Sequence, residues 1–268
     1  MPKRSAPMST PTTYLQSIWS IAKNTYREII RDRLLYGILA VALLVTASSF
    51  FLSTISLEQN NRVLENVGLA SIHLFSFFIC VFVATTSMAR DLERRALYLL
   101  FSKPISRSQY VLGKFVGFLL LLLTCLAILG GLLALGILFT SKGLLLAILI
   151  NLVYSFLEVS FLLAWAVLFA SFTAPLNAAL YTTGLLIIGH SLQTLQAYAA
   201  RFSPPLVQKF ISICYYLLPN LEKFNVRYPV LYGIHVPFTS FFWSLIYWLV
   251  YGGLVLFLAM QVTRTREV

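Results

Sequence analysis

The sequence predicts an all-α integral membrane protein with about six transmembrane helices. Three observations predict this class: composition, six long apolar runs, and basic residues gathered in alternate connections. Hydrophobic residues make up 59% of the chain, charged residues only 11%, and the mean hydropathy is +0.83. Soluble domains carry roughly 45–50% apolar and about 25% charged residues. Because so few charges could not cover a water-facing surface, we expect the bilayer to be the solvent.

The apolar runs are long enough to cross the roughly 30 Å of hydrocarbon, which takes about 20 helical residues. They cover residues 34–55, 67–89, 111–140, 143–172, 178–198 and 236–261. The segment 199–235 contains four prolines and is too broken for another plain span. We expect one or two short re-entrant or interfacial helices there, sheltered by protein. The organisation predicted is a cytoplasmic N-terminus at 1–33 and one membrane domain at 34–268.

Basic residues orient the predicted helices. Fourteen of the 20 Lys and Arg residues fall before the first span, between the second and third, or after the sixth. Lys and Arg accumulate on the cytoplasmic side of membrane proteins, which places both termini in the cytoplasm. The same rule explains the net charge of +11. We expect a multi-pass protein of the cell membrane, the inner membrane of a prokaryote, that contacts lipids and binds no nucleic acid.

Residues 13–33 have the pattern of an amphipathic helix lying in the cytoplasmic headgroup layer. Thr10 and Pro11 suit an N-cap and a first helical position. Apolar residues then recur at helical spacing, and Lys23, Arg27 and Arg31 form a basic ridge on another face. Two roles remain open for this ridge: an anchor to anionic lipid, or a lever that also touches a cytoplasmic partner.

The cytoplasmic segment at about 90–114 is more organised than a topological loop needs to be. Asp91 and Glu93 alternate with basic residues in a charged extension of the second span. An apolar patch around Leu99 and Leu100 follows, and Pro104 breaks the helix. An exposed apolar patch beside charges is typical of a contact site, so the segment predicts docking of a soluble partner.

The string from Glu93 to Lys114, including Ser102, Pro104, Ile105-Ser106-Arg107 and Gly113-Lys114, resembles the first cytoplasmic loop of type-2 ABC transporter permeases. The resemblance extends to the layout of the whole chain. It implies a permease subunit of an ATP-binding-cassette transporter, with a coupling helix in the loop at about 90–110 that docks on a separate ATPase. The residues assigned to docking are Asp91, Glu93, Arg94, Arg95, Leu99, Leu100 and Phe101.

The resemblance also implies an assembly. Two ATPase subunits would bind ATP and Mg, and two permease subunits, identical or different, would enclose the substrate path as an exporter. In such permeases the N-terminal amphipathic helix packs near the ATPase, which assigns Lys23, Arg27 and Arg31 to that contact. The chain has no GxxxxGK[ST] phosphate loop, because GKFVG at 113–117 lacks the first glycine and the hydroxyl. We therefore expect no ATPase activity and no cofactor in this chain.

A few polar residues lie inside the predicted spans. Glu158 falls near the middle of the fourth span, where a charge costs at least about 2.5–3.5 kcal/mol on insertion scales and must face protein or water. It either contacts the substrate path or is a structural carboxyl group hydrogen-bonded to another helix. We expect His190 to be a packing residue and His73 to meet the membrane interface. No histidine lies at metal-ligand spacing from a carboxylate along the sequence, and the three cysteines form no paired motif, so no metal site is predicted.

Two alternative functions remain. One is a membrane-embedded enzyme that uses Glu158 and His190, which predicts activity from the purified chain without nucleotide. The other is an ATPase-coupled regulator that moves no substrate. The short external connections do not favour the regulator, because such proteins usually need a large extracytoplasmic domain.

Overall fold

The computed structural model describes residues 11–55, 60–93, 106–140, 145–202, 204–232, 234 and 236–265. Within these ranges every regular element is helical, as the composition predicts. The α-helices are α1 (Pro11–Ile30), α2 (Arg33–Ile55), α3 (Asn60–Glu93), α5 (Arg107–Thr140), α6 (Leu145–Ala170), α7 (Pro175–Phe202), α8 (Pro205–Leu217), α9 (Arg227–Leu231), α10 (Phe238–Tyr247) and α11 (Gly253–Thr265). A 3₁₀ turn, η1 (Leu221–Phe224), precedes α9, and a π-helical turn, η2 (Trp248–Gly252), joins α10 to α11.

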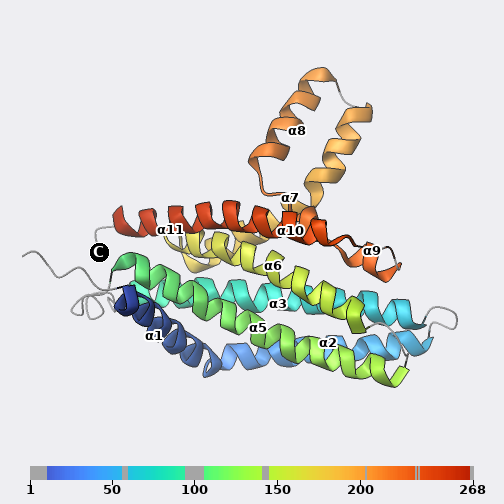
Figure 1. Ribbon diagram of the computed structural model, residues 1–268, viewed down its shortest axis with the longest axis horizontal. Coiled ribbons are helices and arrows are strands. Elements are labelled where there is room, and N and C mark those ends of the chain that lie inside the picture. Colours follow the sequence, from blue (N-terminus) through green and yellow to red (C-terminus); the bar gives the residue numbers. More distant parts are fainter. Residues whose placement is uncertain are drawn as a thin grey trace, which may run out of the picture.

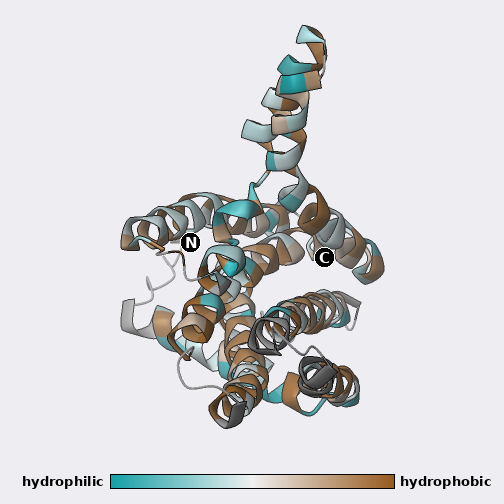
Figure 2. Ribbon diagram, turned by 90° about the vertical axis from the view of Figure 1, so that its right-hand side faces the viewer, coloured by the Kyte–Doolittle hydropathy of each residue, from teal (hydrophilic) through white to brown (hydrophobic). Residues whose placement is uncertain are grey.

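The long helices form a bundle around α3, α5 and α6, which pack against one another (Figure 1). Helix α1 lies along α5, α2 along α3, and α11 along α6. The end of α11 lies at the same end of the bundle as α1 (Figure 1). Viewed along the bundle, the helices consist largely of hydrophobic residues (Figure 2). The fully buried side chains of α3, α5 and α6 include Phe77, Phe118 and Phe161.

Four helices are long and apolar enough to cross a membrane in the part of the chain that the structure describes. They are Asn66–Asp91, Arg107–Leu138, Leu145–Ala170 and Phe238–Arg264, and they match the second, third, fourth and sixth predicted spans. The first predicted span lies in α2. Its apolar part, Leu35–Ser49, is shorter than the four spanning helices in the part of the chain that the structure describes. The fifth lies in α7, where polar residues such as Thr182, His190 and Gln193 lower the hydropathy. The count of six and the orientation of the termini therefore stay predictions.

The predicted broken segment at 199–235 consists of short elements. Pro205 takes the first turn of α8, where its missing N–H leaves no helical hydrogen bond unmade. Helix α8 pairs with the end of α7 in a hairpin that stands away from the bundle (Figures 1 and 2). None of its residues is buried, and Leu206 is 81% exposed. Its position at or in the membrane remains a prediction.

Helix α1 packs closely on α5 because two glycines of α5 face it. A Cβ on Gly113 would lie 2.6 Å from the Ile21 Cβ, and one on Gly117 would lie 2.9 Å from the Thr25 Cβ. Ala22, Thr25 and Ile29 are buried in this contact face. Helix α1 thus has a buried face on α5 and an exposed face opposite, whereas its position in the headgroup layer stays a prediction.

Candidate functional site

Two groups of polar side chains, each partly buried, lie at two different levels of the bundle. The first, which we call the base frame, consists of Asp32, Arg90, Asp91, Tyr110 and Lys114. The Lys114 Nζ lies 2.7 Å from Asp91 Oδ2, and the Tyr110 hydroxyl donates to the same oxygen at 2.7 Å. The Arg90 Nη2 lies 3.1 Å from Asp32 Oδ2. The frame therefore joins the end of α3 to the start of α5 and to the connection between α1 and α2.

The ends of α5 and α11 are also joined at this level. The Arg107 Nη1 donates to the carbonyl oxygens of Thr263 at 2.9 Å and Arg264 at 3.1 Å. The Lys114 ammonium, whose side chain is only 4% exposed, also donates to Ser87 Oγ at 2.9 Å. A buried ammonium with a carboxylate partner and a hydroxyl acceptor is the arrangement that compensates the cost of desolvating a charge.

The structure places only part of the predicted docking set. Asp91 contacts Lys114 and Tyr110 within the chain, and its docking role stays a prediction. Glu93 is the last residue of α3, and its side chain lies outside the described residues. Arg94, Arg95, Leu99, Leu100 and Phe101 also lie outside them. The basic ridge of α1, formed by Lys23, Arg27 and Arg31, is exposed, as the amphipathic pattern predicts.

The second group, which we call the core cluster, consists of His73, Glu158, His190 and Glu222. Glu158 is central to it: its Oε1 lies 2.6 Å from His190 Nε2 and 3.4 Å from His73 Nε2. The other ring nitrogen of His190, Nδ1, lies 3.3 Å from Glu222 Oε2. The Glu158 side chain is 4% exposed, whereas those of His190 and Glu222 are both 33% exposed. The cluster therefore runs from the buried carboxylate outward to Glu222.

Local sequence explains how η1 reaches His190. Gly189 leaves room for η1, because a Cβ there would lie 2.6 Å from Leu221 Cγ and 3.0 Å from the Pro219 carbonyl oxygen. The Asn220 side chain accepts from the Glu222 backbone N–H at 3.0 Å and caps the turn. Asn225 Nδ2 donates to Glu222 Oε1 at 2.9 Å and fixes the carboxylate.

The structure differs from two sequence-based expectations about the histidines. His190 hydrogen-bonds a buried carboxylate instead of serving only in packing. His73 faces Glu158 with a side chain that is 12% exposed, where an interfacial position was expected. No signal along the sequence pairs these residues, because they come from α3, α6, α7 and η1. Two cysteines from different helices, Cys80 and Cys125, also meet in the bundle, and both are free thiols.

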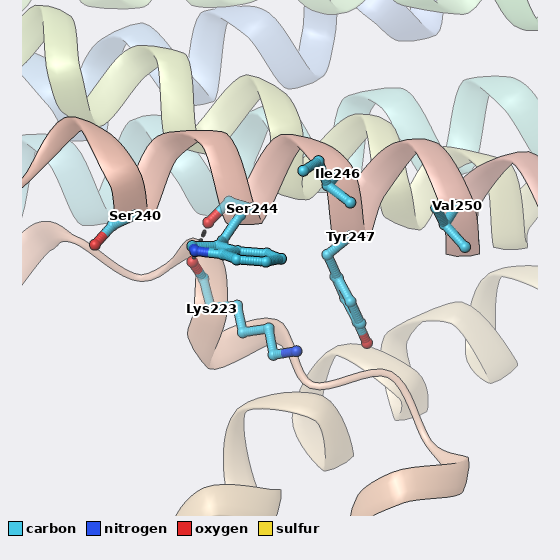
Figure 3. A pocket seen from close by; sticks show the side chains of 7 residues that line it. Lys223, Ser240, Ser244, Ile246, Tyr247 and Val250 are labelled. Atoms are coloured by element: carbon cyan, nitrogen blue, oxygen red, sulfur yellow. Dashed lines mark hydrogen bonds between the residues drawn. The ribbon is translucent and has the colours of Figure 1, made fainter.

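An open groove of about 590 Å³ lies between η1 and the last span (Figure 3). Ser244 Oγ donates to the Lys223 carbonyl oxygen at 2.8 Å, and the Lys223 ammonium lies 4.1 Å from the centre of the Tyr247 ring. The Tyr247 hydroxyl accepts from the Asn220 backbone N–H at 3.0 Å. The Tyr251 hydroxyl donates to the carbonyl oxygen at the end of α8 at 3.0 Å. These contacts hold η1 and α8 on the last span, and the groove lining is mainly apolar, with Trp243, Ile246 and Val250.

Comparison with known proteins agrees with the resemblance predicted for the cytoplasmic segment. A family model described as ABC-2 family transporter protein matches residues 19–262, which include the base frame, the core cluster and the groove. The chain matches no curated protein. Together with the apolar helices, the family match indicates a multi-pass membrane component of an ABC transporter. This is consistent with a chain that is not itself an enzyme. Members of this family generally partner an ABC ATPase subunit. The chain belongs to the ABC-2 family of transporter proteins.

Proposed function

We propose that this chain is the permease subunit of an ABC exporter in which a separate ATPase docks on the segment at about 90–110. Two copies of the ATPase bind ATP and Mg, and two permease subunits, identical or different, enclose the substrate path. The permease moves the substrate by changing between inward- and outward-facing states and performs no chemistry. The single observation that supports this most is the base frame on either side of the docking segment.

The frame gives the docking segment a mechanical connection to the bundle. Asp91 lies at the start of the segment, Tyr110 at its end and Lys114 four residues further on, and Asp91 Oδ2 lies 2.7 Å from both the Lys114 Nζ and the Tyr110 hydroxyl. Because these contacts tie α3 to α5, a displacement of the segment moves both helices together, since interior packing transmits strain. The Asp32–Arg90 contact extends the connection to the start of α2. A docked ATPase would thus move several helices with one contact.

The basic ridge of α1 supports a second contact with the ATPase. Lys23, Arg27 and Arg31 are exposed, while the opposite face of α1 packs on α5. Helix α1 cannot turn its ridge inward, because the glycine contacts at Gly113 and Gly117 fix its rotation. The ridge therefore faces either lipid headgroups or a partner at the same end of the bundle as the docking segment.

The groove beside η1 supports an apolar or amphipathic substrate. Its lining is apolar apart from Lys223 and two serine side chains, and it opens on the last span. Glu158 is proposed as a group on the substrate path that acts through its neighbours, since its own carboxylate is 4% exposed. A substrate would reach it through His190 and Glu222, whose side chains are one-third exposed.

The proposal is tested by co-expressing the chain with an ABC ATPase encoded in a neighbouring reading frame. Glu93→Ala combined with Leu99→Ser and Leu100→Ser should reduce the affinity for the ATPase about tenfold or more, because removing a few central apolar contacts usually dominates an interface. The measurement is copurification, together with the rate of ATP hydrolysis in nanodiscs.

The matched control is Leu206→Ser with Leu217→Ser on α8, two highly exposed leucines of the hairpin. This variant should copurify with the ATPase as the unaltered chain does. Full copurification and coupled hydrolysis in the Glu93, Leu99 and Leu100 variant would show that the ATPase docks elsewhere.

One observation favours the alternative of a membrane-embedded enzyme: the 2.6 Å contact between Glu158 and His190, a carboxylate–imidazole pair of the kind used in acid–base catalysis. That alternative predicts turnover by the purified chain alone, abolished by Glu158→Gln. The permease proposal predicts transport that requires the ATPase and ATP. The near-complete burial of Glu158 favours the permease.

A further inference from the structure

We propose that the core cluster is a binding site for one divalent transition-metal ion of the Zn²⁺ class, with His73 Nε2, His190 Nε2 and a Glu158 carboxylate oxygen as ligands. The three ligand atoms all lie within 4.8 Å of one another. They come from α3, α7 and α6, so a bound ion would join three helices. The proposal departs from the sequence-based expectation of no metal site and does not depend on the transport role.

The chemistry of the donors fits such an ion. Two imidazoles and one carboxylate are a common protein ligand set for zinc, with the fourth position left to water. Bonds of about 2.0–2.1 Å in tetrahedral geometry separate neighbouring ligand atoms by about 3.3 Å. The His73 Nε2 already lies 3.4 Å from Glu158 Oε1. His190 Nε2, now hydrogen-bonded at 2.6 Å, needs only a small side-chain rotation to reach the same separation.

An unpartnered atom points to a missing ligand. His73 Nε2 is buried and has no hydrogen-bond partner among the described residues. Buried polar atoms without a partner are rare and are often explained by an ion or a water. The atom lies 3.4 Å from Glu158 Oε1 without making a hydrogen bond to it, and that separation suits a shared metal ion.

The surroundings of His190 support the same assignment. Metal-bound histidines almost always donate their other ring N–H to a carboxylate or carbonyl, which fixes the tautomer. With its Nδ1 protonated, His190 donates to Glu222 Oε2 at 3.3 Å and turns the Nε2 lone pair toward Glu158 and His73. Asn225 holds the other oxygen of Glu222 at 2.9 Å. The outer carboxylate that a zinc-bound histidine requires is thus in place.

Charge also favours a cation. With both histidines neutral, Glu158 and Glu222 carry two negative charges, and Arg227, which interacts electrostatically with Glu158, supplies one positive charge. A buried net negative charge must be compensated. Protonation of a histidine or a bound divalent cation can do this, so the ion would replace a proton on His190 Nε2.

The test uses the full-length chain in lipid nanodiscs, stripped with a chelator, and Zn²⁺ alone as the probe. All three cysteines are first replaced by alanine, because thiols bind zinc on their own. We expect one Zn²⁺ per chain by titration calorimetry, a higher thermal unfolding midpoint with Zn²⁺, and a visible Co²⁺ spectrum typical of tetrahedral coordination.

The variants separate ligands from outer residues. Glu222→Gln should weaken Zn²⁺ binding about 10–100-fold, as outer-shell changes do. Glu158→Gln and His190→Ala should each weaken Zn²⁺ binding by more than about 100-fold, because they remove a ligand. Glu158→Gln keeps the shape and hydrogen bonds of the side chain, so it reports on metal binding even if His190→Ala does not fold. His235→Ala, which removes the chain's remaining histidine, should bind as the cysteine-free chain does.

Three outcomes would overturn the proposal. These are a cysteine-free chain that binds no Zn²⁺, affinity that is unchanged in Glu158→Gln, and binding that is lost in His235→Ala alone. The first result would mean that protonation of the histidines alone compensates the carboxylates. Either of the other results would mean that the ion binds elsewhere in the chain.

Discussion

The base frame and the core cluster each surround a carboxylate of low exposure, 17% for the Asp91 side chain and 4% for that of Glu158, but with different partners. Asp91 in the frame faces an ammonium at 2.7 Å and a tyrosine hydroxyl at 2.7 Å. Glu158 in the cluster faces two histidines, one at 2.6 Å and the other at 3.4 Å with no hydrogen bond. Lysine is charged at physiological pH, whereas histidine is charged or neutral depending on its surroundings.

Because of this difference, we infer that the contacts of the base frame stay constant whereas those of the core cluster can vary. The frame joins an ammonium and a carboxylate at a short distance, which suits a connection that passes on movement. The cluster changes its charge with proton or metal occupancy, and each state sets a different attraction between α3, α6 and α7. The two carboxylates thus have different roles because Asp91 faces a lysine and Glu158 faces two histidines.

Breaking the frame should have the largest effect on stability. Lys114→Met leaves the partly buried Asp91 carboxylate without its cationic partner and should lower the free energy of unfolding by about 3–5 kcal/mol. Adding Asp91→Asn removes that charge and should restore most of the loss. Arg90→Met, which breaks the pair whose arginine is 37% exposed, should cost only about 0–1 kcal/mol. Unfolding in SDS titrations measures all three, and equal losses for Lys114→Met and Arg90→Met would contradict the inference that the contacts at Asp91 stay constant.

Displacing η1 from the cluster should have an intermediate effect. Gly189→Ala places a methyl group against Leu221 and should cost about 1–3 kcal/mol, as overpacking does. It should also weaken Zn²⁺ binding, because Glu222 moves away from His190. Gly184→Ala in the same helix is the matched control, since a Cβ there meets nothing within 4 Å. That control should be neutral or more stable by about 0.5–1 kcal/mol, because alanine favours helix. Comparable destabilisation by both changes would mean that η1 does not depend on Gly189.

Removing the basic ridge should have the smallest effect on stability. Lys23→Gln, Arg27→Gln and Arg31→Gln alter exposed side chains and should change the free energy of unfolding by no more than about 0.5 kcal/mol each. Copurification with the ATPase in neutral-lipid nanodiscs should nevertheless decrease. If it decreases only in anionic lipid, the ridge is a lipid anchor and the contact with the ATPase is excluded.

Much of the helical layout could be predicted from the sequence because it depends on local properties. The helix start at Pro11, the four helices long enough to span, and the short elements around the prolines of 199–235 all follow from apolar run length and proline chemistry. The spans assigned to α2 and α7 were harder to predict. In α7, polar residues that include His190 of the core cluster lower the hydropathy of the helix.

By itself the sequence predicted the all-helical membrane class and the family, because each depends on composition or on residues close together in the chain. The docking segment stays a prediction. The tertiary structure alone decided which polar groups meet. Asp91 pairs with Lys114 because α3 and α5 pack side by side. Glu158 meets His73, His190 and Glu222 because helix packing brings distant segments together, and a buried carboxylate is stable only where such partners converge.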